Sequence, residues 1–494
     1  MIAPDIATKC PFTRNEKKDF SPEREVEKND SPKHYAVNGG PKGWPVVGLL
    51  PSLIRDRIAF LADNSLRYGD IIPFQVLGKK FIQLNHPDLI KQVLITNNKN
   101  YRKSDTYIQF ESAAGQGLLL SNGEKWRRDR QKIQPMFKRE QIEGYYFDII
   151  NELSESHKQR WLALTENGRA EVDIGYEMAG FTIEVILKSI FGKNNLDKST
   201  VESLRRSYSV ILKYLRNMRL LPKMDLAKLF HTPAYFSFKK ELDNVERVFK
   251  ELLEKYKKGD SSDKYNMLAL LMTAQQQDPE HFTEKDIRDQ CVAMVFAGFE
   301  TTSVLVQWIW YVLDTRPDIV EHLRIDIATH APCTLTKDSL GLSCDAINQM
   351  GYLDAVIKET MRLHPPFWGG SRQALEDDWF GEYKVERGTV VMMSQLVMHR
   401  HPRFWENPNA FIPERFFREN EDKIDVGLYF PFSQGPRKCS GFKFAETEAK
   451  VILAKFLPLF NVRVLNSLNN AVDYGISMKL KQSLKAEIQR VEGP

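Results

Sequence analysis

The segment Phe432-Ser-Gln-Gly435-Pro-Arg437-Lys-Cys439-Ser-Gly441 decides how this chain is interpreted. It places one cysteine in a loop bounded by glycines, directly before a helical pattern over 442–459. Backbone N–H groups at a helix N-terminus favour the thiolate, which is the form of cysteine that binds metals. Gly435 and Gly441 permit tight turns and a close backbone approach to a flat, bulky group. A cysteine taken alone is more often a buried free thiol.

The spacing F-x-x-G-x-R-x-C-x-G resembles the haem-binding loop of the cytochrome P-450 superfamily. The resemblance implies that Cys439 is the axial ligand of the iron of haem b. It also implies that Phe432 and Gly441 belong to the cofactor-binding loop. Arg437, two residues before the sulfur, is expected to meet an anionic group of the cofactor.

A second motif, Ala297-Gly-Phe-Glu300-Thr301, lies inside a long apolar helix that is expected to begin at a capping box, Thr283-x-x-Asp286, and to end near Thr315. A mid-helix glycine lets the backbone widen into a groove. Glu300 is the one charge in an apolar window, where a carboxylate is costly unless it is used or paired. The motif is similar to the distal helix of the same family, which implies that Glu300 and Thr301 relay protons. An exposed glutamate and a helix-interior threonine are the alternative.

A third pattern, Glu359-x-x-Arg362, places two opposite charges on one helical face. It gains weight from Pro413-Glu-Arg415-Phe416, which resembles the P-E-R-F segment of the family. The resemblance implies a buried charge network of Glu359, Arg362 and Arg415 that serves folding and haem incorporation. A common surface Glu/Arg pair is the alternative.

The haem propionates require cationic and N–H donors. Trp126 and Arg130 match the W-x-x-x-R helix of the family, and Arg372 and Arg437 match further propionate partners. An ordinary core tryptophan is the alternative for Trp126. Five more cations are expected to dock an acidic ferredoxin, flavodoxin or reductase domain, although alone they indicate only a solvated basic face: Arg127, Arg128, Lys132, Lys438 and Lys443.

Fewer sequence features indicate which residues contact the substrate. Phe367 and Trp368 follow the stiff segment His364-Pro-Pro, and Phe296 and Ala297 lie one turn before Thr301. We expect these four residues to shape the substrate pocket. Core packing explains Phe296, Phe367 and Trp368 equally well.

The fold class is expected to be mainly α with minor β, as a single-domain cytochrome P-450 fold, a triangular helical domain with small antiparallel sheets. Although 494 residues alone suggest about three domains, no Pro/Gly/Ser-rich linker divides the chain after residue 50. Residues 1–36 are polar and are expected to be disordered, and the haem domain spans 37–494. Strands are expected near 71–76, 80–84, 383–391 and 474–491, a helix over 54–68, and largely helical structure over 122–258 with breaks at 192–196 and 222–233.

Composition excludes several classes of protein. With 70 Lys and Arg against 65 Asp and Glu, the formal net charge is +5, which is no nucleic-acid signature. Five scattered cysteines suggest neither zinc pairs nor a disulfide framework, so a reducing cytoplasm fits best. The first 36 residues lack an apolar core for a signal peptide or anchor. The apolar run over 291–313 is long enough to span a bilayer, but a buried central helix is preferred.

These motifs predict a soluble, cytoplasmic, monomeric haem-thiolate monooxygenase. It is expected to insert one oxygen atom from O2 into a lipophilic substrate, such as a fatty acid, terpenoid or steroid, with electrons from a separate partner. A peroxide-driven or hydroperoxide-rearranging enzyme is the first alternative, although such enzymes commonly lack the acid–alcohol pair. A non-catalytic haem sensor or carrier is the second.

Overall fold

The computed structural model describes residues 34–193, 195–218, 232–258, 263–335, 341–466 and 472–491. The chain forms two compact units. The smaller unit comprises Met1–Thr106 and Met361–Cys439, and the larger unit comprises Tyr107–Thr360 and Ser440–Pro494. The chain crosses from one unit to the other within η5 (Asp105–Phe110) and α16 (Gly351–Leu363), and again after Cys439.

The smaller unit is built on a mixed five-stranded sheet in the order β1-β2-β8-β5-β3. The two strands expected near 71–76 and 80–84 are confirmed as β1 (Ile71–Val76) and β2 (Lys79–Leu84). They pair as a hairpin, with Leu77 and Gly78 both at positive φ, as a type I′ turn requires. The other strands are β3 (Tyr101–Lys103), β5 (Gly370–Ala374), β8 (Val390–Met393) and the separate pair β6 (Asp378–Phe380) and β7 (Tyr383–Val385). The helices and short helical turns are α1 (Leu50–Arg55), α2 (Arg57–Arg67), α3 (Pro87–Lys91), η3 (Gln92–Thr96), η4 (Asn98–Asn100), α17 (Gln395–Met398), η9 (Pro413–Phe416), α18 (Arg418–Glu421) and η10 (Gly435–Arg437).

The larger unit is helical, with two small antiparallel sheets: β4-β12-β9 and the hairpin β10-β11. Its strands are β4 (Arg169–Asp173), β9 (Phe460–Val464), β10 (Val472–Tyr474), β11 (Met478–Leu480) and β12 (Lys485–Arg490). Its helices are α4 (Glu111–Ala114), α5 (Gly123–Ile133), α6 (Arg139–Gln141), α7 (Phe147–Leu164), α8 (Ile174–Phe191), α9 (Lys198–Met218), α11 (Pro233–Lys257), α12 (Met267–Gln277), α13 (Glu284–Asp314), α14 (Pro317–His330), α15 (Cys344–Gln349) and α19 (Phe442–Phe456). Short turns complete it: η6 (Gln134–Phe137), η7 (Ile142–Tyr146) and η8 (Pro332–Leu335).

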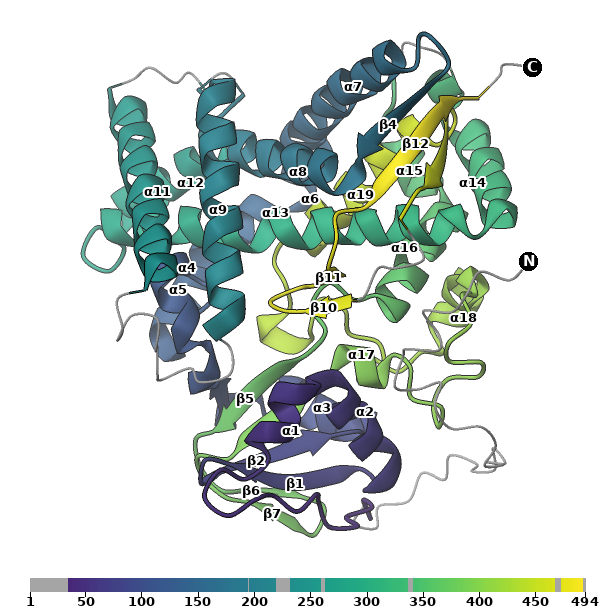
Figure 1. Ribbon diagram of the computed structural model, residues 1–494. Helices are drawn as coiled ribbons and strands as arrows, with labels where there is room; N and C mark the ends of the chain where they lie inside the picture. The colour runs from purple at the N-terminus through teal and green to yellow at the C-terminus, as the bar shows by residue number, and fades with distance from the viewer. Residues whose placement is uncertain are drawn as a thin grey trace. The chain divides into compact units, whose positions relative to one another are not determined.

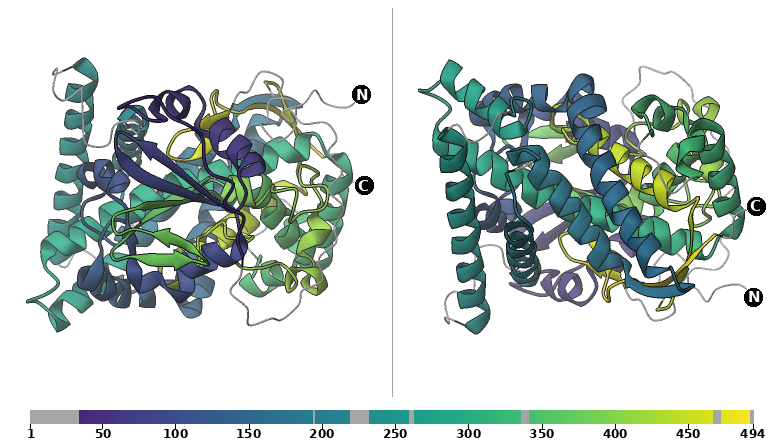
Figure 2. Two further views of the ribbon diagram at one scale, coloured as in Figure 1. Left: turned by 90° about the horizontal axis from the view of Figure 1, so that it is seen from below. Right: turned by 90° about the horizontal axis from the view of Figure 1, so that it is seen from above.

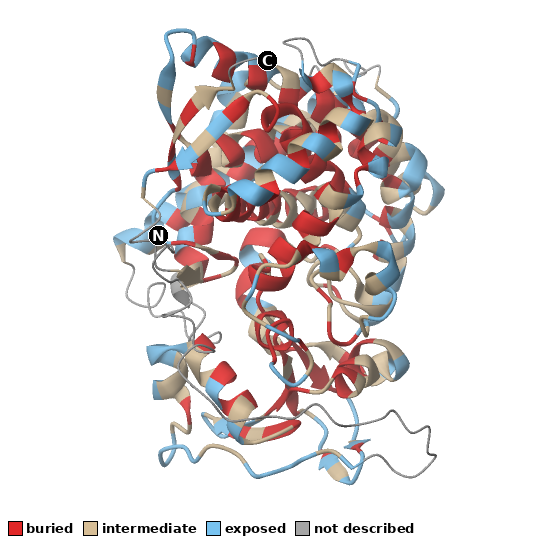
Figure 3. Ribbon diagram, turned by 90° about the vertical axis from the view of Figure 1, so that its right-hand side faces the viewer, coloured by how far each residue is buried: buried red, intermediate tan, exposed pale blue. Residues whose placement is uncertain are grey.

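Helix α13 is the core element of the larger unit. The capping box is confirmed, because Thr283 Oγ1 accepts from the backbone N–H of Asp286 while the Asp286 carboxylate accepts from that of Thr283. Among the described helices, α13 alone is long and apolar enough to cross a membrane, and 72% of its apolar window is buried inside the structure. Helix α8 packs along it, and α9 and α11 pack against each other (Figures 1 and 2). Buried residues concentrate in the interior of each unit (Figure 3).

Two sequence predictions need correction. The single helix expected over 54–68 is interrupted at Asp56, whose extended backbone ends α1 and whose carboxylate caps α2 through the N–H of Ala59. Strand β4 lies within a stretch expected to be helical. It is a strand because it pairs with β12, more than 300 residues later, with Asp173 opposite Lys485. The break over 222–233 lies mostly outside the described residues.

Loss of the α13 cap is expected to weaken the larger unit. Replacing Thr283 with Ala removes the acceptor of the Asp286 N–H, which typically costs about 1 kcal/mol. The free energy of unfolding in urea measures this loss. The variant Thr283→Ser keeps the acceptor and is expected to unfold like the wild type; equal losses in both variants would contradict the capping role.

Candidate active site

The Cys439 loop is shaped by its own backbone. The N–H of Cys439 donates to Phe432 O at 2.9 Å, and η10 forms the turn between them. Gly435 has a φ of +69°, and a Cβ there would lie 1.9 Å from Leu94 O, so no other residue fits. Cys439 is exposed, whereas Cys291 and Cys344 are buried. The alternative of a buried free thiol therefore does not describe Cys439.

A fully buried guanidinium holds the segment that leads to this loop. Arg362 donates to the carbonyl oxygens of His399, Pro408 and Ala410 at 2.7–2.9 Å. The ring of His399 in turn accepts from the N–H of Phe430 through Nε2 at 3.0 Å. Burial first, and then the charge of Arg362, lower the pKa of His399 to about 3, so its ring is neutral and can accept this bond.

The charge network of Glu359, Arg362 and Arg415 stays a prediction, and the structure adds backbone and aromatic contacts to its arginines. Glu359 and Arg362 lie one turn apart on α16, and neither is exposed. Arg415 donates to Asn407 O at 3.0 Å, and the guanidiniums of Arg362 and Arg415 lie 5.0 and 5.9 Å from the centre of the Trp405 ring. Backbone carbonyls and an aromatic face therefore hold the two arginines. The sequence did not reveal these partners.

Two predicted propionate partners in the smaller unit, Arg372 and Arg437, are joined by a third cation that the sequence analysis missed. Lys103 is half-buried. Desolvation, followed by the charges of Arg372 and Arg437, lowers the pKa of Lys103, while Cys439 acts in the opposite direction. Burial and then Arg372 lower the pKa of Arg437 to about 10. Because these cations repel one another beside the thiol, an anionic group among them is favoured. Lys103 carried no signal because it stands in an ordinary charged stretch.

In the larger unit, helix α5 carries Trp126 and Arg130. Arg130 Nη1 donates to Ser440 Oγ at 2.5 Å, so it reaches the residue that follows Cys439 in the chain. Gly441 is the N-cap residue of α19, and a Cβ there would meet the Phe137 ring at 3.4 Å. Trp126 and Phe432 are both half-buried.

Glu300 and Thr301 lie at the middle of α13. Glu300 is 8% exposed, and the Thr301 hydroxyl donates to Ala297 O at 2.8 Å. The alternative of an exposed glutamate is therefore wrong. The helix runs without interruption through Gly298, so the expected widening does not break its hydrogen-bonded ladder. The Thr182 hydroxyl, from α8, donates to Phe299 O at 2.9 Å beside the acid.

The basic residues of α5 have partners within the chain. Lys132 Nζ lies 2.9 Å from Asp278 Oδ2 and its side chain is only 15% exposed, so Lys132 is not the free surface cation expected from the sequence. Arg127 pairs with Glu124, Arg128 is half-buried, and Lys443 on α19 lies 2.9 Å from Glu446 Oε2. Lys438, in the smaller unit, is half-buried. Arg127, Lys132 and Lys443 thus have acidic partners within the chain, and the docking role of the five cations stays a prediction.

The four pocket candidates fall into different environments. Trp368 is buried under the guanidinium of Arg57, 5.6 Å from its ring centre, and its carbonyl accepts from Ser394 Oγ. This favours the core-packing alternative for Trp368. Phe296 packs against Phe110 with ring centroids 6.1 Å apart, while Ala297 and Phe367 are half-buried.

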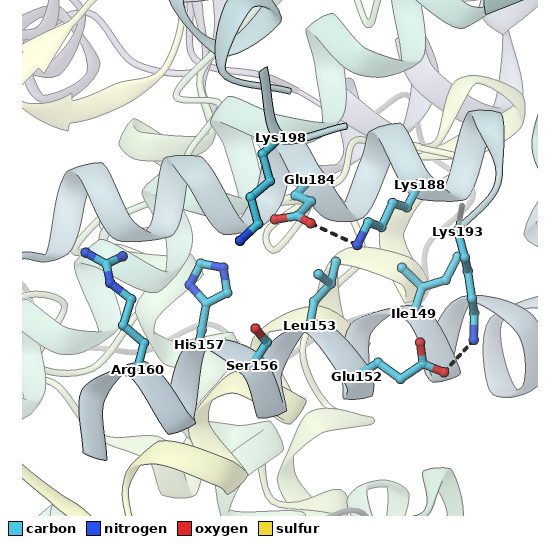
Figure 4. Close-up of a pocket in the computed structure, with 10 residues that line it drawn as sticks. All are labelled: Ile149, Glu152, Leu153, Ser156, His157, Arg160, Glu184, Lys188, Lys193 and Lys198. Atoms are coloured by element: carbon cyan, nitrogen blue, oxygen red, sulfur yellow. Dashed lines mark hydrogen bonds and ion pairs between the residues drawn. The ribbon is translucent and has the colours of Figure 1, made fainter. Parts of the chain in front are cut away.

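A solvent-open cavity of about 620 Å³ lies between α7 and α8 and is lined by none of the predicted site residues (Figure 4). Its charges are largely compensated, because Lys188 pairs with Glu184 at 2.9 Å and Lys193 pairs with Glu152 at 2.6 Å. Its lining consists of Ile149, Glu152, Leu153, Ser156, His157, Arg160, Glu184, Lys188, Lys193 and Lys198. A polar, charge-balanced cavity of this kind does not suit a lipophilic ligand.

A thiol loop, a buried acid–alcohol pair and clustered cations are the parts that a haem-thiolate oxygenase requires. The family model described as "Cytochrome P450" matches residues 39–483, and the chain belongs to this family. It is a cytochrome P450 monooxygenase, an enzyme that uses haem iron, O2, an organic substrate and a redox partner.

The similar curated proteins come from bacteria and animals. Cyclooctatin synthase of Streptomyces melanosporofaciens is 27% identical over 87% of this chain and 91% of its own length. Cytochrome P450 4c21 of Blattella germanica is 29% identical, with 86% and 88% covered. Pentalenene oxygenase of Streptomyces avermitilis is 25% identical, with 87% and 92% covered.

The buried histidines predict a loss of stability in mild acid. Burial lowers the pKa of His399 to about 3 and that of His401 to about 4. The folded state keeps both rings neutral, while the unfolded chain binds protons below about pH 6.5. Stability is therefore expected to fall as the pH drops from about 6.5 towards 4, by up to roughly 1.4 kcal/mol per pH unit for each histidine.

Urea unfolding of the holoprotein at pH 7 and pH 5 measures this slope. The variant His401→Gln removes one titrating ring and is expected to flatten it. His322→Gln, which changes an exposed histidine on α14, serves as the matched control. An unchanged slope in His401→Gln would contradict the assignment.

Proposed function

We propose that this P450 is a soluble, cytoplasmic monooxygenase that binds haem b through Cys439 and oxidises a lipophilic substrate with electrons from a separate donor. The observation that carries the proposal is the Cys439 loop, with its thiol exposed at the N-terminus of α19 and its backbone fixed by Phe432 and Gly435. Residues 37–494 are proposed to act as one haem domain.

The chemistry of the clustered cations fits haem b. Lys103, Arg372 and Arg437 bring three basic side chains together in the smaller unit, where a thiolate and two propionates would supply the opposite charge. By their match to the W-x-x-x-R helix of the family, Trp126 and Arg130 are proposed as further propionate donors, and Phe432 and Gly441 are proposed as parts of the cofactor-binding loop. When bound through a thiolate, haem supplies the oxygen activation.

The protein's own part in the reaction is to deliver protons and exclude water. Glu300 is proposed to take protons from solvent and pass them through the Thr301 hydroxyl or a water held there. Thr301 can exchange its bond to Ala297 O for one to such a water, because a hydroxyl has one donor and two acceptor sites. Phe296, Ala297 and Phe367 are proposed to contact substrate, and Trp368 to support them from the core. Glu359, Arg362 and Arg415 are proposed to serve folding.

The substrate class is proposed by analogy with the relatives, and the electron donor from the charges of the basic residues. Two relatives are named for cyclooctatin and pentalenene, so terpenoids are the first lipophilic class to screen, before fatty acids and steroids. An acidic ferredoxin, flavodoxin or reductase is proposed to be attracted by Arg127, Arg128, Lys438 and Lys443. Their partial neutralisation predicts a modest dependence of the association rate on salt.

The ligand assignment predicts a spectroscopic result. The reduced, CO-bound protein is expected to show the red-shifted Soret band of a thiolate-ligated haem, and Cys439→Ser or Cys439→His is expected to abolish it. Cys333→Ser, which changes another free cysteine, is the control and is expected to keep the band. A wild-type Soret band at the position of an imidazole-ligated haem would refute the thiolate.

The relay predicts uncoupled turnover when either member is lost. Glu300→Gln and Thr301→Val are each expected to lower product formation by about 100-fold, with reducing equivalents appearing as hydrogen peroxide. Glu321→Gln, an exposed acid on α14, serves as control. Full turnover of the wild type with hydrogen peroxide alone, at the rate reached with reduced ferredoxin, would instead support the peroxide-driven alternative.

A further inference from the structure

The hairpin β10–β11 carries a lysine that pairs with the buried acid of α13. Lys479 Nζ lies 2.8 Å from Glu300 Oε1. The lysine side chain is 35% exposed, whereas the glutamate side chain is only 10% exposed. Glu300 is therefore linked to solvent through a cation on another element, and Figure 1 shows this hairpin beneath the middle of α13.

The pair is fixed by a second bond between the same two elements. The indole N–H of Trp308, eight residues after Glu300 on α13, donates to Met478 O at 2.7 Å in a buried position. Met478 directly precedes Lys479 on β11. Because the backbone of β11 is docked in this way, the lysine stem starts from a defined place, and less side-chain entropy opposes the ion pair.

The other strand of the hairpin is tied to a different helix. Asp473 on β10 stands directly opposite Lys479, and its Oδ2 accepts from Arg216 Nη1 of α9 at 2.5 Å. A Cβ at Gly475 would lie 2.7 Å from Arg216 Cδ, so the arginine stem lies closely over the turn. The hairpin thus supplies the acid of an ion pair with α9 and the base of an ion pair with α13, so the two pairs connect these helices.

We propose that Lys479 is a positioning residue for proton delivery: it holds the Glu300 carboxylate at the solvent end of the relay, and the Asp473–Arg216 pair makes that position depend on α9. The inference rests on the proposed relay role of Glu300. In each delivery step a proton passes from solvent to Glu300 and from Glu300 to Thr301 or its water, while the Lys479 ammonium keeps its own proton.

The physical reason is the flexibility of a glutamate. A buried carboxylate must be paired or hydrogen-bonded, and without Lys479 it would turn towards other donors. A relay works only within hydrogen-bond reach of both neighbours, so a change of rotamer interrupts it. A partly exposed ion pair by itself contributes little to stability. A purely structural role therefore predicts no change in the proton-dependent step.

The test uses the holoenzyme with its electron donor and a substrate found by spin-shift screening. Two quantities are measured: product per reducing equivalent, and the solvent deuterium isotope effect on consumption of reducing equivalents. Lys479→Met is expected to lower the first by about tenfold and to enlarge the second. Lys479→Arg keeps the cation and is expected to retain most of both. Lys481→Met removes an exposed lysine two residues further along and is expected to behave like the wild type.

Two further outcomes separate this inference from the proposed function. If Glu300→Gln is uncoupled while Lys479→Met behaves like the wild type, the positioning role is overturned and the relay stands. If Glu300→Gln and Lys479→Met both behave like the wild type, the relay itself is overturned. Equal losses in Lys479→Arg and Lys479→Met would also overturn the role of the cation.

The link to α9 is tested without turnover as well. Asp473→Asn is expected to raise amide hydrogen exchange in the described hairpin residues severalfold in the substrate-free holoprotein, and to enlarge the isotope effect as Lys479→Met does. Faster exchange with an unchanged isotope effect would overturn the coupling between α9 and the relay.

Discussion

The buried guanidinium of Arg362 is the interaction on which the smaller unit depends. Its guanidinium donates to the carbonyls of His399, Pro408 and Ala410, so helix α16, the turn at His399 and the segment 408–410 must come to one point. Removing either side would leave buried polar groups without partners, which costs more than the bonds contribute. Since His399 also receives the N–H of Phe430, polar contacts extend from α16 to the loop that carries Cys439. The thiol is positioned by this framework as well as by its own loop.

The larger unit meets a different problem, because polar side chains lie at the middle of a largely buried helix. Helix α13 packs along α8 and still holds Glu300 and Thr301 at its centre. Each polar group there has a local partner: Ala297 O for Thr301, Thr182 for the carbonyl of Phe299, and Lys479 for the acid. These partners come from the helix itself, from α8 and from the hairpin. The Glu300 carboxylate is therefore kept inside the core without an uncompensated charge.

The sequence predicted well what adjacent residues determine. Neighbouring residues determine the first two strands with their loop, the capping box of α13 and the turn before Cys439, and the structure contains all three features. Prediction from the sequence failed where a residue far away in the chain determines the local structure or neutralises a charge. Strand β4 exists because β12 covers it, and Lys132 is neutralised by Asp278, 146 residues later. Lys103 and Lys479 gave no signal for the same reason, since neither spacing nor composition shows which charges meet after folding.

The basic side chains near Cys439 would couple the binding of an anionic group to the stability of the smaller unit. Desolvation and the charges of Arg372 and Arg437 lower the pKa of Lys103, and desolvation and the charge of Arg372 lower that of Arg437. Electrostatic repulsion within such a cluster destabilises the folded state, and favourable contacts such as those of Arg362 must offset it. An anionic group bound among the three removes that repulsion only in the folded state, so by linkage it stabilises folding by the free energy of its own binding. Lys103 on β3 is paired directly with Arg372 on β5, so an anionic group bound between these two side chains would favour the folded sheet.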